Sequence, residues 1–160
     1  MKNAIESFFL GLLAALGALI AEIVLFSFLC PTKLESNSYC ASFTFLVLVP
    51  AAAEELFKVS IIFKRLKALA SGKALILNSF LLGSGFGLIE LFLIFQKYSL
   101  RSEAFYGGAA GVFTLHIATA TVAGLYLAGK KQPELNHFFK TLLIAFAIHA
   151  LYNTLILAPY

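Results

Sequence analysis

Residues 41–63 read ASFTFLVLVPAAAEELFKVSIIF, and this stretch decides how the chain folds. It is apolar and long enough for a helix that crosses a bilayer, which needs about 20 residues. Yet it carries two adjacent carboxylates, Glu54 and Glu55, and Lys58 follows one helical turn later. Each ionised side chain at the centre of the hydrocarbon costs roughly 2.5–3.5 kcal/mol on insertion scales. Because ionisable groups at this depth are usually functional, we expect a membrane helix that carries a polar site; the alternative is a buried ion pair that only fixes helix packing.

The composition of the whole chain is that of a membrane protein. Of its 160 residues, 61% are hydrophobic and 12% are charged, and the mean hydropathy is +0.92. Soluble proteins carry about 25% charged residues, so the composition excludes a soluble domain. The net charge of +4 is better explained by loops that set the orientation in the membrane than by binding of nucleic acid, which we do not expect as a partner.

Five segments are long and apolar enough to cross the membrane. They are residues 4–29, 41–63, 74–95, 104–128 and 138–157. The first is too long for a removable signal peptide and lacks a convincing cleavage site, so we expect it to remain as a helix. No linker or repeat divides the chain. The sequence therefore predicts an all-α, multi-pass bundle of about five transmembrane helices, forming a single integral membrane domain over residues 1–160.

The lysines and arginines of the connecting segments predict the orientation, because basic loops stay in the cytoplasm. One side of the membrane would hold Lys2, Lys64, Arg65, Lys67, Lys73, Lys130, Lys131 and Lys140, and the other Lys33, Lys97 and Arg101. From this bias we expect a cytoplasmic amino terminus and an extracytoplasmic carboxyl terminus, and we expect the protein in the plasma membrane. Cys30 and Cys40 flank an outward loop, where they either form a disulfide or, for Cys30, serve as a small apolar residue at a helix end.

Polar residues recur on three further segments: Glu90 on the third, His116 on the fourth, and His149 with Asn153 on the fifth. At about 1.5 Å of rise per residue, Glu54 and both histidines fall near the middle of the membrane. Residues three or four apart share a helix face, so Lys58 can neutralise either glutamate of the pair. We expect it to pair with the glutamate that the chemistry does not need, and we expect all these groups to converge on one layer of the bundle.

Such a group of residues, without a cysteine or an obvious serine nucleophile, is suited to the activation of water. A buried glutamate can act as general base, and a histidine can hold the water or protonate a leaving amine. A histidine and an asparagine can donate hydrogen bonds to the oxyanion that develops on a scissile carbonyl. The alternative is a zinc ion held by Glu54, His116 and His149 with an open position, although the sequence has no HExxH motif. We favour a site without a cofactor, and zinc stays the alternative.

Several motifs resemble a known family. Residues 54–58 read EELFK, an EExxK pattern, residues 85–90 read GFGLIE, and residues 149–153 read HALYN, an HxxYN pattern. His116 begins a small-residue stretch between the last two. In this order the motifs resemble the PrsW-type intramembrane protease family, which is related to the CAAX-processing and bacteriocin-processing membrane proteases. The sequence departs from that pattern at Leu91, where an asparagine is often found, and at Asn153, where an aspartate is frequent.

The resemblance implies a glutamate-type peptidase that hydrolyses a peptide bond of a membrane protein or peptide within the lipid bilayer. Carried over by position, Glu54 is the catalytic base, His116 its partner on the water, and His149 with Asn153 the pair that binds the oxyanion or positions the substrate. Glu55 completes the glutamate pair, and Lys58 and Glu90 support the site.

Two other classes of function fit the same residues. Chains of glutamates and histidines inside membranes also make proton relays, so a small proton- or ion-coupled carrier is one alternative. The absence of an internal repeat disfavours it. An inactive relative that binds membrane segments is the other. Glu22, near the outer end of the first segment, is given no role.

Overall fold

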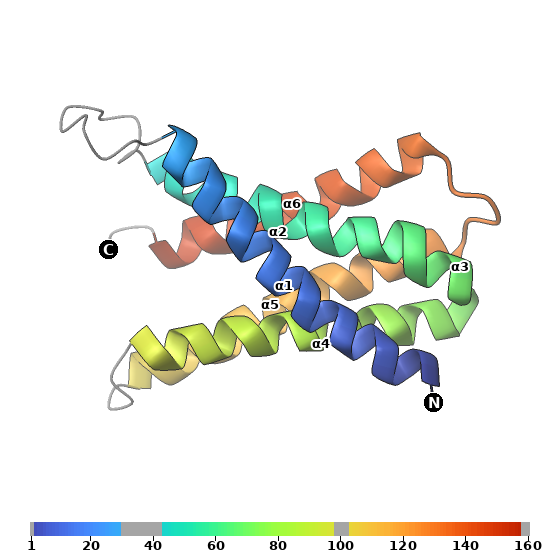
Figure 1. Ribbon diagram of the computed structural model, residues 1–160, viewed down its shortest axis with the longest axis horizontal. Coiled ribbons are helices and arrows are strands. Elements are labelled where there is room, and N and C mark those ends of the chain that lie inside the picture. The colour runs from blue at the N-terminus through green and yellow to red at the C-terminus, as the bar shows by residue number, and fades with distance from the viewer. Residues whose placement is uncertain (1, 30–42, 98–102, 158–160) are drawn as a thin grey trace.

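The computed structural model describes residues 2–29, 43–97 and 103–157. These form helices and no strand, so the predicted all-α bundle is confirmed (Figure 1). In chain order the elements are α1 (Lys2–Leu29), α2 (Phe43–Ile61), the π-helical turn η1 (Ile62–Leu66), α3 (Lys67–Leu69), α4 (Gly72–Lys97), α5 (Glu103–Ala128) and α6 (Leu135–Leu157). Cys30 and Cys40 lie outside the described residues.

Four of the helices, α1, α4, α5 and α6, are long and apolar enough to cross a membrane. They identify a multi-pass membrane protein. The fifth long helix, α2, has 19 residues and differs from them because it carries Glu54, Glu55 and Lys58. It runs unbroken through Pro50. The helical path continues through η1 and α3 to Leu69, beyond the span end expected at residue 63, so the basic residues after that point lie on helix.

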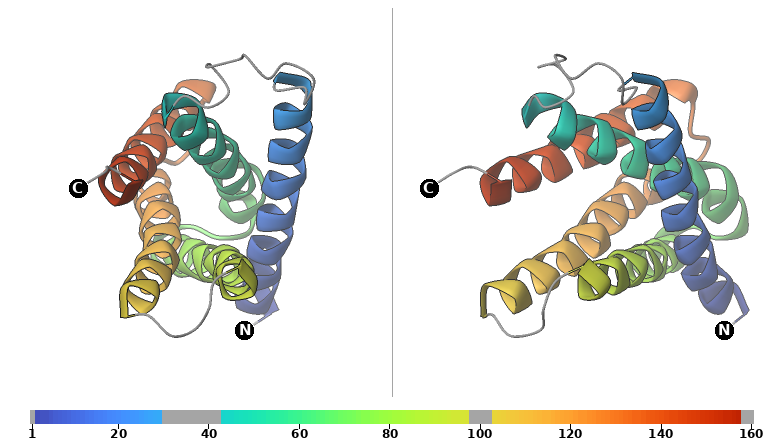
Figure 2. Two further views of the ribbon diagram at one scale, coloured as in Figure 1. Left: turned by 90° about the vertical axis from the view of Figure 1, so that its left-hand side faces the viewer. Right: turned by 60° about the vertical axis from the view of Figure 1, so that its left-hand side comes forward.

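The five long helices form a ring. Figure 2 (left) looks along the bundle and shows them in the order α1, α2, α6, α5, α4, and each helix contacts its two neighbours in that order. The side chains of α2 that face inward are therefore enclosed by the four apolar helices. This arrangement explains how charges on α2 can lie inside the bundle and away from lipid.

Glycines bring α4 close to both of its neighbours. Gly85 lies against the Phe8 carbonyl of α1, and Gly83 lies against the His116 carbonyl of α5, where an added Cβ would come within 2.5 Å of the oxygen. Small residues allow such close approach of helices in membranes, where packing drives association. The contact at Gly83 positions the backbone that carries His116.

One half of the bundle interior is apolar. There η1 and the end of α2 pack against α4, α5 and α6 through a group we call the apolar core: Val59, Ile62, Leu66, Leu75, Leu82, Ala120, Ala123, Leu127 and Ala145. Large apolar side chains also cover the outside of the helices, as on Phe28, which is 81% exposed, and Ile20, which is 63% exposed. Outward apolar side chains suit contact with lipid tails.

The start of α1, the α3–α4 turn and the α5–α6 connection lie at one end of the bundle (Figure 1). At the α3–α4 turn Gly72 has a φ of +54°, a conformation that glycine adopts at little cost. The basic residues assigned to one side of the membrane thus share one end of the molecule. The cytoplasmic location of that end stays a prediction.

Candidate active site

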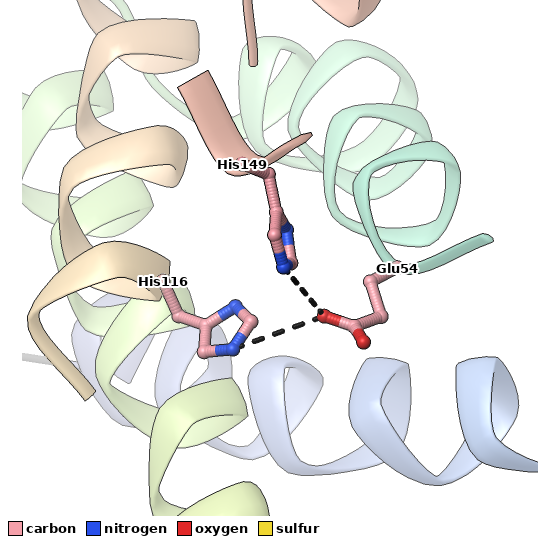
Figure 3. Close-up of side chains that lie close together, drawn as sticks. All are labelled: Glu54, His116 and His149. Carbon is pink, nitrogen blue, oxygen red and sulfur yellow. Dashed lines mark ion pairs between the residues drawn. The ribbon is translucent and has the colours of Figure 1, made fainter. Parts of the chain in front are cut away.

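A buried group of charged and polar side chains adjoins the apolar core. We call it the polar layer: Glu54, Glu55 and Lys58 from α2, Glu90 from α4, His116 and Thr119 from α5, and His149 from α6. Figure 3 shows Glu54, His116 and His149 converging from three different helices. The predicted convergence of these residues is therefore present in the structure.

Lys58 is the centre of the layer. Its side chain is 0% exposed, and its ammonium donates hydrogen bonds to Glu55 Oε1 at 2.6 Å, His116 Nδ1 at 2.8 Å and Thr119 Oγ1 at 3.0 Å. An ammonium has three N–H donors, and all three are used. The ring of Phe86 lies 4.8 Å from Nζ and adds a cation–π contact. Lys58 pairs with Glu55 and not with Glu54.

These bonds decide which nitrogen of His116 carries the proton. A lysine ammonium can only donate, so Nδ1 of His116 must accept from Lys58. The proton of the neutral imidazole is then on Nε2, which donates to Glu90 Oε2 at 2.5 Å. His116 thereby links the lysine to the carboxylate of α4, and its Nε2 is a donor.

His149 has the opposite arrangement. Its Nδ1 lies 2.8 Å from Glu55 Oε1, and since that carboxylate already pairs with Lys58 it is ionised and can only accept. Nδ1 of His149 therefore carries the proton, and Nε2 holds a free lone pair. The two histidine rings meet edge to face with their centroids 5.3 Å apart, so one donor and one acceptor nitrogen lie beside each other.

Glu54 faces both histidines without a close partner. Its Oε2 is 3.7 Å from His149 Nε2 and 3.8 Å from His116 Nε2, beyond hydrogen-bond distance (Figure 3). This oxygen is buried and accepts no hydrogen bond from any described residue. An unsatisfied buried polar atom costs about 1–3 kcal/mol, and more when it is charged, so its persistence needs a cause. When Glu54 is ionised, its Oε2 and His149 Nε2 are two acceptors facing each other, and a group that donates two hydrogens would satisfy both.

A small cavity reaches Glu54 from the side of α1. It has a volume of about 30 Å³ and is lined by Ala15, Ala18, Leu19, Glu22, Glu54, Phe86, Ile89, Glu90 and Leu93. Glu22 was given no role from the sequence, yet it shares this cavity with two residues of the polar layer. The sequence signal was a carboxylate with apolar residues on both sides, well away from the start of the segment where Glu6 lies.

Glu54, His116 and His149 fit the zinc alternative only in part. Ligand atoms of Glu54, His116 and His149 lie within 4.8 Å of one another. His149 suits a metal, because a histidine ligand usually donates its other N–H to a carboxylate, as it does here to Glu55. His116 does not, because binding a metal through Nε2 would turn an Nδ1–H toward the Lys58 ammonium, donor against donor. Two of the three ligands fit, and the third requires Lys58 to lose its proton.

Asn153 is the predicted site residue that the structure leaves apart. It lies one turn beyond His149 on α6, is partly buried, and makes no hydrogen bond with the described residues. Its predicted role at the oxyanion thus has no contact to support it, and that role stays a prediction.

No protein-family model matches the chain, and neither a curated protein nor a solved structure matches it. The resemblance to the PrsW-type proteases therefore rests on the sequence motifs alone.

Proposed function

We propose that the protein is an intramembrane peptidase, which hydrolyses a peptide bond of a membrane-associated protein with a water molecule activated by Glu54 and His149. The observation that carries the proposal is the pair of facing acceptors, Glu54 Oε2 and His149 Nε2, 3.7 Å apart. A water that donates one hydrogen to each acceptor keeps a lone pair free for attack, which is the arrangement that general-base catalysis needs.

In the proposed reaction the water oxygen attacks the carbonyl carbon of the scissile peptide, and Glu54 or His149 takes the proton. The carbonyl becomes an oxyanion, and the Nε2–H of His116, which bonds to Glu90 Oε2 in the structure, would be shared between that carboxylate and the oxyanion. The carbon–nitrogen bond then breaks as the stored proton passes to the leaving amine. Because His149 offers the lone pair and His116 the hydrogen, this assignment exchanges the roles that the resemblance implied for the two histidines.

Lys58 and Glu55 hold this arrangement in place. Together they determine both tautomers: Lys58 bonds to His116, and Glu55 bonds to His149. Groups locked by such bonds need little rearrangement during the reaction, which is the basis of preorganised catalysis. In the proposed reaction, Lys58 and Glu55 therefore position the reacting groups and do not contact the substrate.

The test compares membranes that hold the wild-type protein with membranes that hold Glu54→Gln. The isosteric amide cannot take a proton, so we expect new protein termini within or beside membrane spans for the wild type and none for the variant. Glu134→Gln is the matched control, because Glu134 is an exposed glutamate in the α5–α6 connection. Mass spectrometry of peptide termini makes the comparison, and identical termini from the Glu54 variant would exclude the mechanism.

The same preparations decide between water alone and zinc. With Lys58 bonded to His116, we expect purified active protein to contain no stoichiometric zinc and to keep its activity after chelation and removal of the chelator. Elemental analysis of the protein measures the metal. Zinc at one ion per chain, together with loss of turnover on its removal, would replace the metal-free mechanism.

A further inference from the structure

The cavity beside α1 has a chemistry that the proposed site alone does not explain. Three carboxylates line its 30 Å³, those of Glu22, Glu54 and Glu90. Glu90 bonds to His116, but no lysine or arginine among the described residues pairs with Glu22 or Glu54. Carboxylates left without partners in a membrane interior are too costly to persist dry.

The size and the lining of this space suit water. A cavity of about 30 Å³ is large enough for water, since one water needs roughly 10–15 Å³. Glu22 and Glu90 do not belong to the one cluster of possible metal ligands among the described residues, which is Glu54 with the two histidines. The space therefore suits water.

The position of Glu22 shows on which side of the buried site the cavity lies. It lies seven residues before the end of α1 at Leu29, about 10 Å along the helix axis. Glu54 is the more buried of the two, at 6% exposed, and its unsatisfied Oε2 faces the histidines, whereas Glu22 is half-buried. In Figure 3 the second oxygen of Glu54 points away from both histidines, toward the ribbon of α1. One carboxylate thus stands between the buried site and the membrane face at which α1 ends.

We propose that this cavity is the water entrance of the buried site, and that Glu22 is a positioning residue that holds water there by hydrogen bonds and passes it to Glu54. The inference rests on the proposed function, because hydrolysis consumes one water for every peptide bond cleaved. It adds a residue of α1 to a site that otherwise uses α2, α4, α5 and α6. Water in the cavity can be tested without any substrate.

The first experiment detects that water by X-ray radiolytic footprinting in water enriched in oxygen-18, with the protein in lipid nanodiscs. Radicals formed from a bound water oxidise the side chains around it. Two adjacent pairs serve as matched comparisons: Leu19 in the cavity wall with lipid-facing Ile20, and Ile89 in the wall with Leu88, which is 44% exposed. We expect severalfold more labelling at Leu19 and Ile89, although their neighbours are the more exposed residues. Equal or weaker labelling of the cavity wall would overturn the proposal.

The second experiment separates Glu22→Leu from Glu22→Gln. The leucine removes the hydrogen bonds that hold water, so labelling of Leu19 and Ile89 should fall to the level of their neighbours, while glutamine, which still donates and accepts, should keep it. With a substrate found by the terminus comparison, Glu22→Leu should lower kcat about tenfold or more at unchanged KM, because the attacking water is misplaced. Glutamine should restore most of the rate. A merely structural role would change stability or KM and would not be rescued by glutamine.

The results also distinguish the two proposals. If Glu54→Gln continues to cleave while the cavity wall is labelled, the water cavity stands and the peptidase mechanism fails. If Glu54→Gln is inactive but Glu22→Leu has the kcat and the labelling of the wild type, the peptidase stands and the role of Glu22 is wrong.

Discussion

The polar layer around Lys58 and the apolar core around Val59 are neighbours on α2, and both exclude solvent: each of these two side chains is 0% exposed. In the apolar core, burial needs no functional reason, because removing apolar surface from water or packing it closely is favourable. In the polar layer, burial is a cost that hydrogen bonds offset only in part, since one oxygen each of Glu54 and Glu55 has no partner among the described residues. The apolar core therefore holds the bundle together, whereas the unsatisfied oxygens of the polar layer indicate a functional role.

The largest expected effect is on activity, and it tests whether the polar layer does chemistry at all. His149→Ala removes the acceptor nitrogen opposite Glu54, so the rate of peptide cleavage should fall about 10²- to 10⁴-fold, the usual contribution of an acid–base group. Cleavage of the substrate by purified protein is the measurement. His137→Ala, in the first turn of α6 and away from the layer, is the control. If the rate of His149→Ala stays within a few fold of the wild type, the polar layer has a structural role and no catalytic one.

The next effect tests whether the layer depends on its central cation. Lys58→Met keeps an unbranched side chain but leaves the Glu55 carboxylate buried and uncompensated, a change that costs about 3–5 kcal/mol of stability. Thermal unfolding in detergent measures it. The variant Glu55→Gln with Lys58→Met removes both charges, and we expect it to regain much of the loss. Equal instability of the single and double variants would mean that the ion pair is not the cause.

A substitution in the apolar core should lower the stability of the protein and leave its activity unchanged. Leu66→Ala in η1 leaves a cavity among residues that are 0% exposed, and such changes cost about 2–5 kcal/mol. Unfolding should begin at a lower temperature, while cleavage per folded molecule stays as in the wild type, because the site residues keep their bonds. Loss of activity in protein that is still folded would show that the two halves are coupled.

The smallest effect concerns the third hydrogen bond of Lys58. Thr119→Val keeps the volume and removes the hydroxyl that accepts from Nζ at 3.0 Å, so we expect a loss of about 1 kcal/mol. Thr141→Val on α6 is a matched control, since its hydroxyl bonds only to a backbone carbonyl of its own helix. A loss no larger than that of the control would show that two partners are sufficient for Lys58.

Much of the bundle could be predicted from the sequence, because hydropathy is a local property. The long apolar stretches and the shared depth of Glu54, His116 and His149 follow from residue type and helical spacing. The end of the second helix could not be predicted in the same way. A run of basic residues is compatible both with a loop and with a helix that continues into the membrane interface, and the structure extends it to Leu69.

The candidate site divides similarly. By itself the sequence determined that Lys58 would neutralise one glutamate of the pair, since both are within one turn of it. Only the tertiary structure decided that this is Glu55. His149 and Lys58 both bond to the same oxygen of Glu55, and neither bonds to Glu54. The same is true of the two tautomers and of Glu22. Each depends on which side chains of other helices come within hydrogen-bond distance, and helical periodicity predicts the face of a residue but not the neighbour that the face will meet.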